Sequence, residues 1–393
     1  MLSQIRGKDH ENQREVLLGA LGIDCGERFY PSFNTIKTWA EKCGLSKLGK
    51  RDKSLKDCCL IVDESISVNS EKLLLVLGAP SNATGYPLKA SDVRVLGMSV
   101  GPSRKGQDIS DEIKSVTDST GVNPSYVLGD GGRNLVSGSS LAGYTYHLDC
   151  SHTIANILKA VYGSNPDFQD LNEAIGRTRH YALSRYAYLM PPSMRSIARY
   201  MNITQWLYWA VAMNRNASIK MAPAERRMYS FLQKHASLVD ELAEVMECIN
   251  QVLKILKCDG LSVRTMDECR KLIFSRMMSS STNARKVGSA IISYLEGEIS
   301  KMGDSDESHI ISSDIIESLF GYDKSKMSKN KRAGFTSQVL ILSMKPYVEN
   351  TSSLDAMDIK NMLESTTVND VDNWRKTNLM PSQMMKRAFA LSA

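Results

Sequence analysis

Residues 58–68 read CCLIVDESISV, an apolar run typical of a buried β-strand, and this run carries an acid, Asp63, at its centre. A buried carboxylate is costly unless it is paired, hydrogen-bonded or bound to a metal ion. Glu64 follows directly, but the alternation of side chains along a strand places it on the opposite face of the sheet. Asp63 is therefore the first candidate for a functional acid.

Two further acids occur in comparable settings. Asp130 closes a second apolar run, YVLGD at residues 126–130, and Glu317 lies one turn into an expected helix that begins SSDIIE at 312–317. Each also has a purely structural explanation, because Asp at a strand end often forms a turn and Asp314 with Glu317 has capping-box spacing. Together, in this order, the three carboxylates predict a site with hard oxygen ligands for two Mg²⁺ or Mn²⁺ ions.

The pattern around these acids predicts a mixed five-stranded sheet with flanking helices, an α/β arrangement. The expected strands are residues 58–68, 72–78, 92–100, 126–129 and 145–148, with helices at 108–119 and 134–141. After Cys150, helical periodicity continues to about Met302, with breaks at prolines and at Gly260. The sequence therefore predicts a large all-α block between the last strand and the helix of Glu317.

A short helical region precedes the sheet. Helices are expected at residues 11–21 and from Ser32, as N-cap, to Cys43, with Gly44 at the C′ position. Followed by basic residues, this pair fits either a helix-turn-helix that reads DNA or a small packing appendage. Both interpretations stay open.

The expected domains follow from these patterns. They are a small helical N-terminal region and DNA-binding candidate (1–55), the first part of the sheet domain (56–150), an all-helical insertion (151–305), the helix that carries the glutamate (306–345) and a helical C-terminal tail (346–393).

The composition of the 393-residue chain is that of a soluble globular protein with room for two or three domains. The sequence has no run of eighteen apolar residues and no signal-peptide pattern, which predicts a cytoplasmic protein without a membrane span. Its eight cysteines lack CxxC spacing and favour reduced thiols over a disulfide framework or a zinc cluster.

Basic residues gather in two places, although the net charge is only +6. One cluster precedes the first strand and includes Lys50 and Arg51. The other follows Glu317 and comprises Lys324, Lys326, Lys329, Lys331 and Arg332. Basic clusters beside an acidic metal site predict a polyanionic substrate, whereas solvated surface lysines would give the same pattern without function.

Asp149 and His152 stand at the start of the helix expected after the last strand. Asp149 has the position of a helix cap, and a lone Cys-x-His is too little for a zinc site. His152 is interpreted as a residue that supports the metal ligands or contacts phosphate, or else as one with local hydrogen bonds only. Trp206 and Trp209 share a helix face and are predicted core residues, with stacking on a displaced base as the alternative.

Three motifs together resemble those of the DDE transposases with an RNase H-like catalytic domain. They are LIVD at residues 60–63, YVLGDGG at 126–132 and SSDIIESLFG at 312–321. The chain looks most like the bacterial insertion-sequence type, in which an all-helical insertion separates the fifth strand from the glutamate helix. The segment PSFNTIKTW at 31–39 also resembles one that those enzymes carry, so the resemblance covers about residues 30–345.

The resemblance implies an RNase H-like fold in which Asp63, Asp130 and Glu317 are the catalytic ligands of two Mg²⁺ or Mn²⁺ ions, with Asp149 and His152 near the site. It implies that a homo-oligomer, associated with the nucleoid, cuts transposon ends and joins them to target double-stranded DNA by transesterification. Two alternatives stay open. One is a domesticated or truncated relative that binds DNA without transposition, and the other is an RNase H-fold nuclease that uses only water as its nucleophile.

Overall fold

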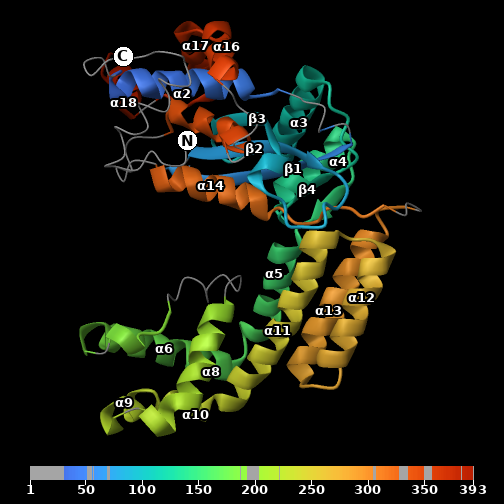
Figure 1. The fold of residues 1–393 in the computed structure, drawn as a ribbon, viewed down its shortest axis with the longest axis vertical. Coiled ribbons are helices and arrows are strands. Elements are labelled where there is room, and N and C mark those ends of the chain that lie inside the picture. The colour runs from blue at the N-terminus through green and yellow to red at the C-terminus, as the bar shows by residue number, and fades with distance from the viewer. Residues whose placement is uncertain are drawn as a thin grey trace. The chain divides into compact units, whose positions relative to one another are not determined.

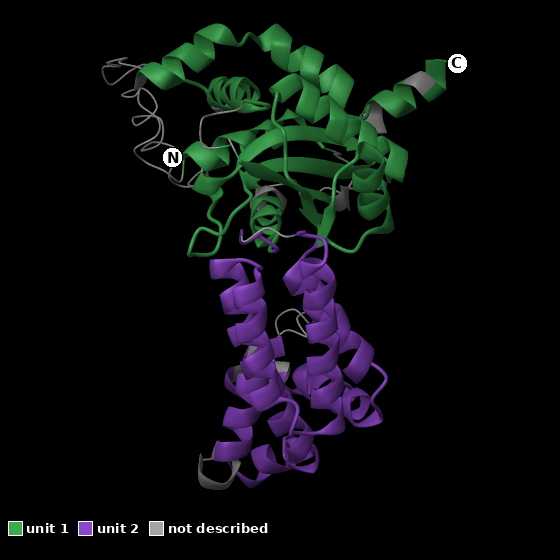
Figure 2. Cartoon of the chain, turned by 90° about the vertical axis from the view of Figure 1, so that its right-hand side faces the viewer, with its two compact units in different colours: residues 1–147, 312–393 green, residues 148–311 purple. Residues whose placement is uncertain are grey.

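The computed structural model describes residues 31–50, 55, 57–68, 71–185, 187–192, 203–220, 222–303, 307–326, 335–348, 356–381 and 383–392. The fold is α/β, as predicted. The chain divides into two compact units, which are residues 1–147 with 312–393 (unit 1) and residues 148–311 (unit 2) (Figure 2).

Unit 1 is built on a mixed five-stranded sheet in the order β3-β2-β1-β4-β5, which confirms the predicted strand number (Figure 1). The strands are β1 Cys58–Val68, β2 Glu71–Pro80, β3 Arg94–Gly101, β4 Val127–Gly129 and β5 Tyr146–Leu148. β2 runs antiparallel to β1 and β3, whereas β4 runs parallel to β1. The predicted strand bounds differ from these by at most two residues.

Two of the predicted helices, α3 (Gly106–Thr120) and α4 (Arg133–Ala142), pack against each other beside the sheet. Their contact is close at Gly138, where a Cβ atom would lie 2.5 Å from the side chain of Ile109. The helix that carries Glu317 is α14 (Asp314–Lys326), which packs against β1. In Figure 1, α14 and the α3–α4 pair lie on different sides of the sheet.

The helix α2 (Phe33–Lys47) begins as predicted, with the Ser32 hydroxyl accepting a hydrogen bond from the Thr35 N–H at 3.1 Å. The prediction of its end was wrong, because the helix continues past Cys43 and Gly44 lies inside it. A Cβ atom at Gly44 would lie 2.2 Å from the carbonyl oxygen of Leu340. Glycine is therefore needed here for a close packing contact and not for a helix end. The helix expected at 11–21 lies outside the described residues.

Several of the C-terminal elements pack against α2. The C-terminal elements are η5 Ser337–Met344, α15 Lys345–Val348, α16 Ala356–Ser365, α17 Val368–Asn378 and α18 Gln383–Ser392, of which η5, α16 and α17 contact α2. A 3₁₀ turn, η3 (Ala90–Asp92), packs against α15. Ala40 and Cys43 of α2 share an apolar cluster with Met344, Ile359 and Met362. The N-terminal region and the C-terminal tail, expected as separate segments, thus meet in one core.

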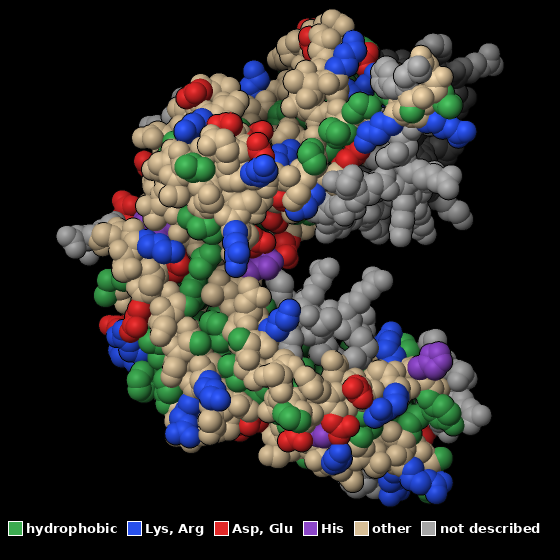
Figure 3. Space-filling model, turned by 180° about the vertical axis from the view of Figure 1, so that it is seen from behind, with side chains coloured by type: hydrophobic (Ala, Val, Ile, Leu, Met, Phe, Trp, Pro, Cys, Tyr) green, Lys and Arg blue, Asp and Glu red, His purple; other side chains and the backbone are tan. Residues whose placement is uncertain are grey.

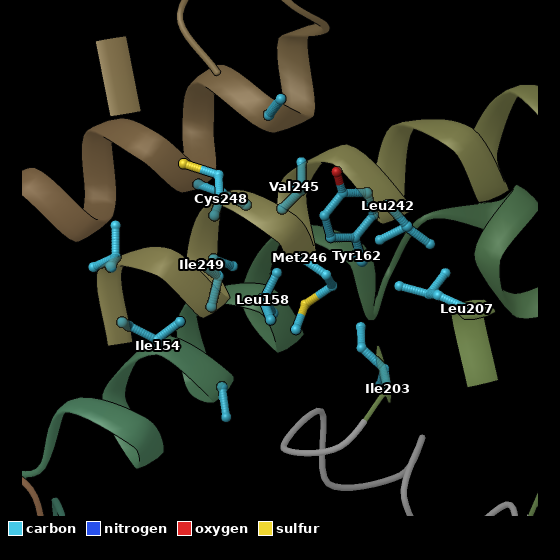
Figure 4. Close-up of a cluster of buried hydrophobic side chains, with 14 of the residues drawn as sticks. Ile154, Leu158, Tyr162, Ile203, Leu207, Leu242, Val245, Met246, Cys248 and Ile249 are labelled. Atoms are coloured by element: carbon cyan, nitrogen blue, oxygen red, sulfur yellow. The ribbon is translucent and has the colours of Figure 1, made fainter. Parts of the chain in front are cut away.

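Unit 2 is helical throughout its described residues apart from an isolated β-bridge between Leu261 and His309. Its elements are α5 Cys150–Tyr162, α6 Pro166–Arg185, η4 Ala187–Leu189, α8 Ile203–Lys220, α9 Pro223–Met228, α10 Ser230–Lys234, α11 Ala236–Asp259, α12 Val263–Arg276 and α13 Thr282–Ile299. The core gathers around α11, where Leu242, Val245 and Ile249 lie near Leu158 of α5 (Figure 4).

Several single-residue predictions have clear outcomes. Trp206 is a core residue, as predicted, with 1% of its surface exposed, and Trp209 packs against the same cluster. The described cysteines are free thiols, and all of them are buried except Cys258. None of the helices in the described residues combines the length and the apolar character needed to cross a membrane.

Candidate active site

Asp63 lies within β1, and Asp130 lies one residue past the end of the adjacent parallel strand β4. The parallel register pairs Ile61 of β1 with Leu128 of β4, and each aspartate follows two positions later in the sequence. Gly129, which precedes Asp130, lies very close to β1, because a Cβ atom at this position would be 2.5 Å from a backbone carbonyl oxygen of β1. Neighbouring strands are about 4.8 Å apart, so the two carboxylates extend from adjacent backbone sites.

The contacts of Glu64 show which face of the sheet its side chain points to. Its carboxylate accepts hydrogen bonds from Arg104, just before α3, at 3.2 Å and from Asn134 of α4 at 3.0 Å, and it pairs with Lys72 at 3.4 Å. The Glu64 side chain is therefore turned toward α3 and α4 and is only 5% exposed. By strand alternation, Asp63 points to the other face, in agreement with the prediction for this pair.

Asp130 shapes the turn after β4. Its Oδ1 accepts a hydrogen bond from the Gly132 N–H at 2.8 Å, and its carbonyl oxygen accepts one from the Tyr146 hydroxyl at 2.7 Å. The turn-forming role suggested by the sequence is therefore present. It is compatible with metal binding, because each carboxylate oxygen has two lone pairs.

Glu317 is exposed on the first turn of α14, the helix that packs against β1. The helix begins at Asp314 itself, one residue earlier than a capping box with Asp314 as N-cap would require. Among the described residues, no three or more His, Cys, Asp and Glu side chains are grouped as a metal site would need. Asp63 and Asp130 thus extend from β1 and from the end of the adjacent strand β4, and Glu317 lies on a helix that packs against β1.

Asp149 and His152 belong to unit 2, whereas the three acids belong to unit 1. Asp149 caps α5, as predicted, by accepting a hydrogen bond from the His152 N–H at 2.7 Å. The same carboxylate lies 3.0 Å from Nδ1 of the His152 ring. Since the Asp149 side chain is fully buried and the histidine is 26% exposed, the aspartate orients the imidazole at the surface.

Two polar residues of α13, the partly buried Tyr294 and the buried Glu298, bind the backbone next to Asp149 and were not singled out from the sequence. The Tyr294 hydroxyl donates to the Leu148 carbonyl at 2.7 Å, and Glu298 accepts from the Leu148 N–H at 3.3 Å. Burial raises the pKa of Tyr294 well above its usual value. Their spacing of four residues within an otherwise apolar helix face is the signal in the sequence that would have revealed them.

The predicted DNA contacts are only partly covered by the described residues. Lys50 is exposed just after α2. Lys324 and Lys326 lie in the last turn of α14, and Arg51, Lys329, Lys331 and Arg332 fall outside the described residues. On the face drawn in Figure 3, Lys and Arg side chains are interspersed with Asp and Glu.

No protein-family model matches this sequence, and no curated protein matches it significantly. The function must therefore be inferred from the residues and their arrangement.

Proposed function

We propose that this protein is a DDE-type transposase with an RNase H-like catalytic core, interrupted by the helices of unit 2 as an insertion. The observation that carries the proposal is the position of Asp63 within β1 and of Asp130 one residue past the end of the adjacent parallel strand β4, in a sheet ordered β3-β2-β1-β4-β5. Glu317, on the helix packed against β1, is the third member of the catalytic set.

The donor set fits Mg²⁺ or Mn²⁺, because these ions prefer carboxylate oxygens and keep further positions for water and substrate phosphate. A bound pair of ions supplies charge stabilisation at the phosphorus and lowers the pKa of the attacking water or 3′-hydroxyl. Asp63 extends from the backbone of β1, and Asp130 extends from the turn after β4, where the Tyr146 hydroxyl donates to the Asp130 carbonyl. Glu317 completes the set from α14.

The proposed substrate is double-stranded DNA, at the two transposon ends and at the target. Joining two ends requires at least two active sites in register with one another, so we propose that the working form is a homo-oligomer assembled on DNA. Its proposed cellular location is the cytoplasm, in association with the nucleoid.

The proposal is tested with duplexes from both flanks of the coding sequence, incubated with the purified protein and Mg²⁺ or Mn²⁺. We expect cleavage near the ends and, from a precut end, joining to a target plasmid. Asp63→Asn should lower both rates by about two to three orders of magnitude, the equivalent of losing several kcal/mol of metal-derived stabilisation. Asp57→Asn, an exposed acid just before β1, is the matched control and should react like the wild type.

Other outcomes separate the alternatives. Cleavage without strand transfer from a precut end would identify a nuclease of the same fold. DNA binding without any metal-dependent cleavage would identify a relative that only binds DNA.

A further inference from the structure

One stretch of unit 2 carries an excess of positive charge, in addition to the two lysine clusters of unit 1. Residues 166–235 contain ten Lys or Arg and four Asp or Glu, an excess equal to the +6 of the entire sequence. Eight of the ten are Arg, although Lys is the commoner of the two in the full chain. The rest of unit 2 contains more acids than bases. Arg195 and Arg199 lie outside the described residues, so a surface for a polyanion is sought on the described helices of the stretch.

The described helices of this stretch form one body, here called the basic lobe, which consists of α6, η4, α8, α9 and α10. α10 packs against α6, α8 and α9, and α6 packs against η4. An ion pair between Lys234 of α10 and Asp170 of α6, at 2.5 Å, ties two of these helices together. The Tyr229 hydroxyl donates to the Leu189 carbonyl at 2.7 Å and ties a third element, η4, to the junction of α9 and α10.

Two of the four acids in residues 166–235, Asp170 and Glu225, are engaged in contacts between elements of the basic lobe. Asp170 contacts Lys234 and also His235, at 3.1 Å. Glu225 accepts hydrogen bonds from the Tyr188 hydroxyl and from a backbone N–H at the start of α9. These two carboxylates hold helices of the lobe together, whereas Asp167 and Glu173 are exposed, and Glu173 pairs with Arg177 at 3.6 Å.

Exposed arginines occur on several elements of the basic lobe. Arg226 and Arg227 are consecutive on α9, Arg215 lies on α8, and Arg177 lies on α6. All four side chains are exposed. Figure 3 shows Lys and Arg side chains over this end of unit 2, with Asp and Glu side chains among them. Arginine matches phosphate oxygens with two parallel hydrogen bonds, which makes this composition typical of nucleic-acid contacts.

Exposed tyrosines accompany the arginines. Residues 166–235 contain ten aromatic residues in 70 positions, against 7% in the whole chain. Tyr188 is 75% exposed, Tyr208 is 61% exposed and Tyr181 is 47% exposed. They are the most exposed large apolar side chains among the described residues of the lobe. The Tyr188 hydroxyl donates to Glu225, whereas Tyr208 can offer its hydroxyl to a phosphate oxygen.

From these observations we infer that the basic lobe is a second interface of this protein, which binds the sugar–phosphate backbone of double-stranded DNA. The inference rests on the proposed function for its choice of duplex DNA. It places the contact on α6, η4, α8, α9 and α10 and outside the lysine clusters expected from the sequence. Binding there neutralises phosphates through arginine and carries no base specificity.

The test compares two pairs of substitutions in the full chain. Arg226→Gln with Arg227→Gln removes adjacent bases from α9, and Arg285→Gln with Lys286→Gln removes an adjacent exposed pair from α13 of the same unit. Binding of a labelled 30-base-pair duplex is measured by fluorescence anisotropy over a range of salt concentrations without divalent metal. We expect the α9 pair to weaken binding about tenfold and to reduce the salt slope by about two, and the α13 pair to change neither.

Equal binding by both variants, or equal weakening, would overturn the inference. The inference would also be overturned if the α9 variant lost binding to phosphatidylserine vesicles but kept its binding to duplex DNA. Circular dichroism and thermal melting establish that both variants are folded. Because metal is absent, the result is independent of catalysis. If the basic lobe binds DNA but the protein never cleaves DNA, only the proposed function is refuted. If the protein cleaves DNA and the α9 variant binds the duplex as well as the wild type, only this inference is refuted.

Discussion

Asn134 of α4 donates a hydrogen bond of 3.0 Å from Nδ2 to the Glu64 carboxylate of β1. This bond joins the residue after Asp63 to the helix that follows Asp130. Arg104 strengthens the same junction by an ion pair with Glu64 at 3.2 Å. On the face of the sheet opposite the proposed site, these polar contacts of Glu64, here called the anchor, therefore fix β1 to α4 and to the residues just before α3.

The anchor gives a first prediction. Glu64→Gln removes the charge that Arg104 and Lys72 face and should lower the free energy of unfolding by about 3 kcal/mol, because a buried ion pair that loses one partner is strongly destabilised. Urea denaturation measures the change. Asp111→Asn, an exposed acid of α3, should alter stability by less than about 0.5 kcal/mol. Equal effects of the two substitutions would show that the Glu64 contacts contribute little.

Gly44 gives a second prediction. Gly44→Ala should destabilise the protein by about 1–3 kcal/mol, because the added Cβ atom would meet the Leu340 carbonyl oxygen at 2.2 Å and force α2 away from η5. Gly297→Ala in α13 is the matched control, since nothing lies within 4 Å of its Cβ position. In that helix alanine should stabilise by about 0.5–1 kcal/mol. Thermal melting that ranks the two substitutions the other way would contradict the packing of α2 on η5.

The thiols give a third prediction. Burial raises the pKa of Cys59 and of Cys269 to about 12, so their thiolate fraction at pH 8 is on the order of 10⁻⁴. Iodoacetamide applied to the native protein at pH 8 should therefore modify Cys258, which is partly exposed, far faster than either buried thiol. Peptide mass spectrometry reads the result, and unfolding in guanidinium should remove the difference. Rapid native labelling of Cys59 would contradict the buried position of β1.

Asp170 gives a fourth prediction, about the stability of the protein at acidic pH. Its hydrogen bond with Lys234 is the main cause that lowers the pKa of the Asp170 carboxyl, and His235 adds to it. A lowered pKa in the folded state stabilises the protein above the unfolded value of about 3.9, and this contribution is lost as pH falls through the folded pKa. Between about pH 5 and pH 3, the wild type should therefore lose more stability than Asp170→Asn. Identical pH profiles by urea denaturation would refute this. Asp167→Asn serves as the control.

The sheet could be predicted because its signals are local. The alternation of side chains around Asp63 placed Glu64 on the far face, and the apolar runs gave each strand to within two residues. The role of Gly44 could not be predicted, because the atom that requires glycine belongs to Leu340, almost three hundred residues away in sequence. The same applies to the packing of α2 against α16 and α17, which no local pattern reveals.

Some residues of the candidate site could be predicted from local sequence signals, and others could not. Asp63 stands out within an apolar strand and Asp130 at the end of one, and β1 and β4 are adjacent and parallel. Glu317 is identified only by motif and by its helix, since its exposed position is that of an ordinary surface glutamate. The arginines of the basic lobe were overlooked because they are dispersed along the sequence and come together only when α6, α8, α9 and α10 pack.

The most direct test of the central claim is an anomalous difference map from crystals soaked in Mn²⁺. We predict Mn²⁺ peaks at about 2.2 Å from carboxylate oxygens of both Asp63 and Asp130, with Glu317 turned toward the same site, and no such peaks in crystals of Asp63→Asn. Crystals in which Mn²⁺ binds elsewhere, or in which the Asp63→Asn variant keeps the same peaks, would contradict a metal-dependent active site at this position.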